Sequence, residues 1–60
     1  MYTKIKTKDG DVFAFTTQQY EVGLYVMITD DKGNFIDQFG SDLKEEEFHN
    51  KLKEEYTEVI

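Results

Sequence analysis

The chain has 60 residues, a formal net charge of −6, and no cysteine or proline. The lack of thiols excludes a disulfide scaffold and a cysteine-ligated zinc module. No segment approaches the roughly 18 apolar residues that span a membrane, and the first residues form no apolar run of signal-peptide length. We therefore expect one small globular domain over residues 1–60, soluble in the cytoplasm and without a membrane partner.

The first predicted pair of elements is a β-hairpin with strands at about 2–8 and 11–17. Its turn ends at Gly10, a residue type that adopts positive φ without strain. A two-residue loop would set lysines opposite aromatic rings, whereas a three-residue loop pairs Ile5 with Phe13 and separates charged from apolar side chains. We predict the three-residue loop, which gives the hairpin one core face made of Ile5, Phe13 and Phe15.

The link at residues 16–20 leaves two alternatives open. Thr16 and Gln19 have the spacing of a capping box, which would begin a helical turn. The same polar residues are equally compatible with a loop between two strands.

The second predicted hairpin has strands at about 21–30 and 34–39, joined by a turn that ends at Gly33. Both of its faces are apolar. On the third strand one face carries Val22, Leu24, Val26 and Ile28, and the other carries Tyr25 and Met27. On the fourth strand Phe35 and Phe39 fall on one side and Ile36 on the other. Gly23, inside the third strand, indicates a bulge or a bend.

A helix is predicted over about 42–58. Ser41 or Asp42 can cap its N-terminus, and acidic residues suit the positive end of its dipole. One apolar stripe follows helical spacing and consists of Phe48, Leu52, Tyr56 and Val59.

The order of these elements predicts an α+β fold: a four-stranded antiparallel meander of two hairpins, followed by one C-terminal helix packed on one sheet face. In element order alone, this ββββα unit is similar to the dimeric single-strand-binding coactivator domains. The resemblance implies a fold and not a function. The basic, aromatic-lined strand surface that such binders use is not evident in the sequence.

One helix can cover only one side of the sheet, although the second hairpin is apolar on both sides. Strong twist could bury both faces locally, or another molecule could cover the open one. A chain this short buries only about 60% of its unfolded surface, so a second subunit would add stability. We predict a non-catalytic protein that acts through protein contact, as a homodimer through the sheet or with another protein. The candidate contact residues are Tyr25, Met27, Phe35 and Phe39.

The charge distribution supports two alternative hypotheses less well. Lys4, Lys6 and Lys8 alternate along the first strand and could bind single-stranded nucleic acid, although the net charge of −6 opposes this. Lysines on an edge strand also protect it from aggregation. The acidic residues of the predicted helix could instead mimic nucleic-acid charge and inhibit a protein that handles DNA or RNA.

No pattern in the chain predicts an enzyme, a cofactor or a metal site. The only histidine, His49, falls beside the apolar stripe of the helix, and we expect it to be solvated or half-buried, without a catalytic partner. The acidic turn at residues 30–34 lacks the spacing and the terminal Glu of a calcium loop. No glycine-rich phosphate loop is present.

Overall fold

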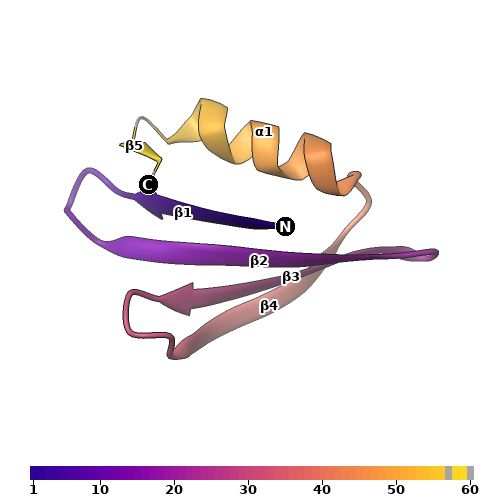
Figure 1. Ribbon diagram of the computed structural model, residues 1–60, viewed down its shortest axis with the longest axis horizontal. Helices are drawn as coiled ribbons and strands as arrows, with labels where there is room; N and C mark the ends of the chain where they lie inside the picture. The colour runs from indigo at the N-terminus through magenta and orange to yellow at the C-terminus, as the bar shows by residue number, and fades with distance from the viewer. Residues whose placement is uncertain (57, 60) are drawn as a thin grey trace.

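A computed structural model of the chain describes residues 1–56 and the backbone of residues 58 and 59. Four antiparallel strands form a meander, and one helix packs on it (Figure 1), which confirms the predicted α+β fold. The elements are β1 (Tyr2–Lys6), β2 (Val12–Tyr20), β3 (Gly23–Asp30), β4 (Phe35–Ser41), α1 (Glu45–Glu55) and β5 (Glu58–Val59). The strand order in the sheet is β4-β3-β2-β1-β5.

The first hairpin has the predicted register, with Ile5 opposite Phe13 and Thr3 opposite Phe15. The Gly10 amide donates to the Thr7 carbonyl at 3.0 Å, and Gly10 has the positive φ of 89° that the turn requires. β1 ends at Lys6 rather than at residue 8, because Thr7 already belongs to the turn.

The link at residues 16–20 is neither a loop nor a helical turn, because β2 continues to Tyr20 and pairs along its length with β3. Val22 is not on the third strand, in contrast to the predicted range of about 21–30: it lies in the tight turn before β3 and is 97% exposed. Of the bulge or bend predicted at Gly23, the bulge is absent, since Gly23 pairs regularly with Tyr20. A side chain there would place its Cβ 3.2 Å from the Ser41 carbonyl oxygen, and the φ of 149° also favours glycine.

The one shift of register lies between β3 and β4. Ile28 pairs with Asp37 and Thr29 with Phe35, so that Ile36 is an extra residue on β4. Side chains alternate between faces along a strand, and one extra residue reverses the alternation. Phe35 and Phe39 therefore lie on opposite faces, in contrast to the prediction that they share one.

The helix is shorter at both ends than the predicted range of 42–58. Ser41 pairs with Leu24 at the end of β4, and the N-cap is Lys44 without a side-chain cap, so neither Ser41 nor Asp42 caps the helix. After Glu55 the backbone becomes extended, and β5 pairs with Ile5 and Lys6 of β1. Val59 is thus in a strand and not in the helix, and Thr57 lies outside the described residues.

The hydrophobic core lies between α1 and the face of β1–β3 beneath it, which we call the inner face. Its buried residues are Ile5, Phe15, Leu24, Val26, Phe48 and Leu52. The helix contacts β1 and β2, and the β3–β4 hairpin lies on the far side of β2 from it (Figure 1). The helix therefore leaves two surfaces without cover: the opposite face of β1–β4, which we call the outer face, and the free side of β4.

Candidate interaction surface on the β3–β4 hairpin

Exposed apolar side chains concentrate on β4. Of the seven exposed large hydrophobic residues in the described chain, three lie on this strand: Phe35 is 59% exposed, Ile36 45% and Phe39 40%. Every residue from 31 to 40 is exposed. A large hydrophobic residue exposed alone is ordinary, but three on one strand, divided between its two faces, are typical of a strand that another chain contacts.

β4 is also an open edge of the sheet. At the opposite side β5 covers part of β1, whereas no described strand pairs with the free side of β4. The strand contains no lysine and no proline, the residues that commonly protect edges, and its one charged residue is Asp37. The Asp37 carboxylate accepts a 2.7 Å hydrogen bond from the backbone amide of Gln38. This amide is therefore directed away from β3.

The four residues predicted as a contact surface are divided between two faces. Tyr25, Met27 and Phe35 lie on the outer face, where the Tyr25 hydroxyl donates to Gln38 Oε1 at 2.7 Å. Phe39 lies on the inner face, with its ring centroid 6.2 Å from that of Phe48 in α1. Sequence reasoning omitted Gln38, whose outward amide becomes visible only once the pairing with β3 is known.

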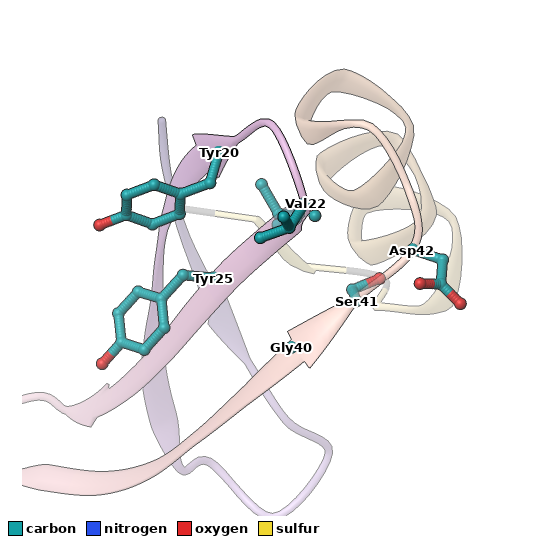
Figure 2. A pocket seen from close by; sticks show the side chains of 8 residues that line it. Tyr20, Val22, Tyr25, Gly40, Ser41 and Asp42 are labelled. Carbon is teal, nitrogen blue, oxygen red and sulfur yellow. The ribbon is translucent and has the colours of Figure 1, made fainter.

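A pocket of about 340 Å³ lies at one end of the sheet, between the β2–β3 turn, the start of β3 and the end of β4. Figure 2 shows Tyr20 and Tyr25 lying next to each other on one side of it, with their hydroxyls pointing the same way. Gly40 pairs with Tyr25 and has no side chain, which leaves the space beside the Tyr25 ring open. The full lining is Tyr20, Val22, Gly23, Leu24, Tyr25, Gly40, Ser41 and Asp42.

The outer face of β1–β4 carries two lysines and no acidic residue. Lys4 and Lys6 alternate along β1, but Lys8 lies in the turn, so the three lysines do not form the predicted strip. Lys4 Nζ lies 3.2 Å from Asp31 Oδ1 at the far side of β2. The Lys4 side chain therefore crosses over Ala14, its partner in the register, which explains why Ala14 is only 5% exposed on an otherwise open face.

A polar cluster links the helix to the sheet on the inner face. His49 is 1% exposed, in contrast to the expectation of a solvated or half-buried side chain. The Thr17 hydroxyl lies 2.7 Å from Glu45 Oε2 and 2.8 Å from His49 Nε2, and the Thr3 hydroxyl contacts His49 Nδ1. The Met1 amino group also donates to Glu45.

Hydrogen-bond chemistry assigns the protons in this cluster. A carboxylate only accepts, so the single Thr17 proton goes to Glu45, and Thr17 accepts from the Nε2–H of a neutral His49. His49 Nδ1 then accepts from Thr3. Burial lowers the pKa of His49, while the Thr17 hydrogen bond lowers that of Glu45. The cluster thus holds a neutral histidine as a structural bridge, with each ring nitrogen occupied.

The described residues hold neither a cluster suited to a metal ion nor a membrane-spanning helix. No group of three or more histidine, aspartate or glutamate side chains among them could hold a metal ion. No helix in the described range is both long and apolar enough to cross a membrane. Comparisons of the chain with protein-family models, curated proteins and solved structures find no match in any of the three.

Proposed function

We propose that this protein is a small, non-catalytic binding protein that acts through protein contact at the β3–β4 hairpin. The observation that carries the proposal is the exposure of Phe35, Ile36 and Phe39 on a strand whose free side has no partner in the described sheet. Fully burying a large apolar side chain contributes about 1.5–3 kcal/mol. The exposed part of these three side chains therefore supplies a driving force for association.

Capture with a tagged copy of the chain tests this proposal. The tagged protein is incubated with untagged chain and, separately, with cell extract, as wild type and as the variants Phe35→Lys and Phe39→Lys. Val22→Lys is the control, because Val22 is apolar, is more exposed than Phe35 or Phe39, and lies in the β2–β3 turn rather than on β4. We expect a protein to bind wild type and Val22→Lys and to be lost from both β4 variants. Capture that is indifferent to the β4 variants, or no capture at all, would contradict the proposal.

A second candidate function is the binding of single-stranded nucleic acid on the outer face. Here Lys4 and Lys6 lie with exposed Tyr2 and Tyr20, and no position of β1–β4 on this face is acidic. Aromatic rings that stack on bases, together with lysines, are the elements of such surfaces. A labelled oligonucleotide should then bind in a salt-dependent manner, and Tyr20→Ala should weaken it. If the titration gives no salt-sensitive signal, the second candidate is excluded.

A further inference from the structure

We propose that β4 pairs antiparallel with β4 of a second copy of this chain across a two-fold axis, which joins the two sheets into one continuous sheet. This inference rests on the proposed function and names the partner. Adding a strand to an open sheet edge uses main-chain hydrogen bonds for affinity and alternate side chains for specificity. In a two-fold arrangement the same surface serves both copies.

The backbone of β4 is prepared for such pairing. From Asp37 to Ser41, five consecutive residues pair with β3 without a shift, so the bulge lies outside this stretch. The Gln38 amide points away from β3, and alternation in an antiparallel ladder directs the Gly40 backbone groups the same way. A regular run of five residues is close to the length of an average strand.

The positions of the phenylalanines favour pairing at the edge over stacking of sheet faces. Phe35 is on the outer face and Phe39 on the inner face of the same strand. A dimer that stacked two outer faces would cover Phe35 and leave Phe39 exposed. A second β4 paired alongside the first places side chains of the partner strand next to both Phe35 and Phe39.

The positions of Asp37 and Phe39 together favour one register. If Gln38 of one copy lies opposite Gly40 of the other, Phe39 lies opposite Phe39, and Asp37 lies opposite Ser41. This register keeps the two Asp37 carboxylates apart and brings the Phe39 side chains together at a non-hydrogen-bonded position, where paired Cα atoms are about 4.5 Å apart.

The net charge of −6 does not oppose this arrangement strongly. The acidic first turn of α1 is held over β1 and β2, where Glu45 accepts from Met1 and Thr17, although Phe48 further along the helix contacts Phe39 of β4. In the joined sheet, five strand spacings separate the β2 strands of the two copies, about 24 Å. Screening by physiological salt acts over about 8 Å, so the two helices repel each other only weakly.

Two variants at one position test the backbone pairing. Gln38→Pro removes the outward amide without removing a hydrogen bond to β3, whereas the matched control Gln38→Thr keeps that amide. Both variants lose the bond from Tyr25. Sedimentation from millimolar to micromolar concentration should give twice the chain mass of 7.1 kDa for wild type and Gln38→Thr at high concentration. Gln38→Pro should associate about tenfold more weakly or not at all.

Single cysteines supply a test that does not depend on the folding of the proline variant. The chain has no native cysteine, so Phe39→Cys introduces one thiol, directly opposite its copy in the proposed register. Mild oxidation should cross-link Phe39→Cys much faster than the exposed control Val22→Cys.

Each outcome of these tests decides the matter. A wild-type chain that is monomeric at every concentration overturns self-pairing, but leaves the proposed function to the capture of another protein. A dimer that tolerates Gln38→Pro, or equal cross-linking at residues 22 and 39, overturns pairing through β4. Dimer loss in folded Gln38→Pro alone, with selective cross-linking at residue 39, supports it.

Discussion

Phe35 and Phe39 lie on opposite faces of β4, although residues four apart on a regular strand share a face. The extra residue between the partners of Thr29 and Ile28 causes this division. As a result, the edge strand presents an exposed aromatic side chain on each face, and its contact surface is the edge rather than either face.

The two phenylalanines should respond differently to substitution by lysine. Phe39 packs against Phe48, so Phe39→Lys should lower the free energy of unfolding by about 1–2 kcal/mol, as well as weaken association. Phe35 has no such helix contact among the described aromatic pairs, so Phe35→Lys should weaken association alone. Urea unfolding at low concentration, with sedimentation at high concentration, separates the two effects. Equal loss of stability in both variants contradicts the assignment of faces.

Asp37 should weaken pairing at the open edge, because its carboxylate accepts the hydrogen bond of the Gln38 amide that pairing needs. Asp37→Ala frees this amide and removes a charge from the strand. The dimer dissociation constant should then fall by at least about fivefold, the equivalent of two hydrogen bonds, because the two-fold axis places one freed amide in each copy. Glu54→Ala removes one exposed acid on α1 and serves as the control for net charge. Equal tightening in both variants would attribute the effect to charge alone.

The stability of the fold should fall in acid because of His49. Burial lowers its pKa below the ordinary 6.5, so between these two values the unfolded chain binds more protons than the folded chain. Stability is then complete above about pH 6.5 and decreases as the pH falls through the folded pKa. The lowered pKa of Glu45 adds a further loss below about pH 4.5. Unfolding curves of wild type and His49→Gln between pH 5 and 7.5 test this, since the variant should lack the first decrease. An identical slope in both would show that His49 is not the titrating group.

Thr17 should be the most sensitive polar residue of the chain, because its hydroxyl connects Glu45 to His49. Thr17→Val keeps the shape but leaves the buried Nε2–H without a partner, at a cost of about 1–3 kcal/mol. Thr17→Ser keeps the hydroxyl and should cost less than Thr17→Val. Thermal unfolding of the three proteins measures the order, and a more stable valine variant would contradict the proposed bridge.

The sequence predicts the fold class and the first hairpin because local chemistry fixes both. Gly10 sets the turn, and the separation of lysines from aromatic residues then allows a single register. The C-terminal bound of the helix was wrong for a non-local reason: β5 pairs with an edge of β1 that is far away in the sequence. Periodicity alone cannot distinguish Val59 in a helical stripe from Val59 in a short strand.

The candidate surface could be predicted in composition but not in geometry. Apolar residues on both sides of the second hairpin indicated an uncovered apolar face, and Phe35 and Phe39 are indeed exposed. Phe39 nevertheless lies on the helix side of the sheet, because the bulge at Ile36 has no local signal such as glycine. Only a weak feature of the sequence indicated that His49 is buried. Thr3 and Thr17 stand two residues from Ile5 and Phe15, and so on the core face, where a buried polar partner is required.

Hydrogen exchange at the amides of Gln38 and Gly40 tests the central claim most directly, because these are the outward amides of β4. If β4 pairs with β4 of a second copy, both amides become protected as the concentration rises from micromolar to millimolar, while exposed amides in the β1–β2 turn do not change. If the two amides exchange at the same fast rate at every concentration, the β4 edge is not the surface through which this protein pairs with itself.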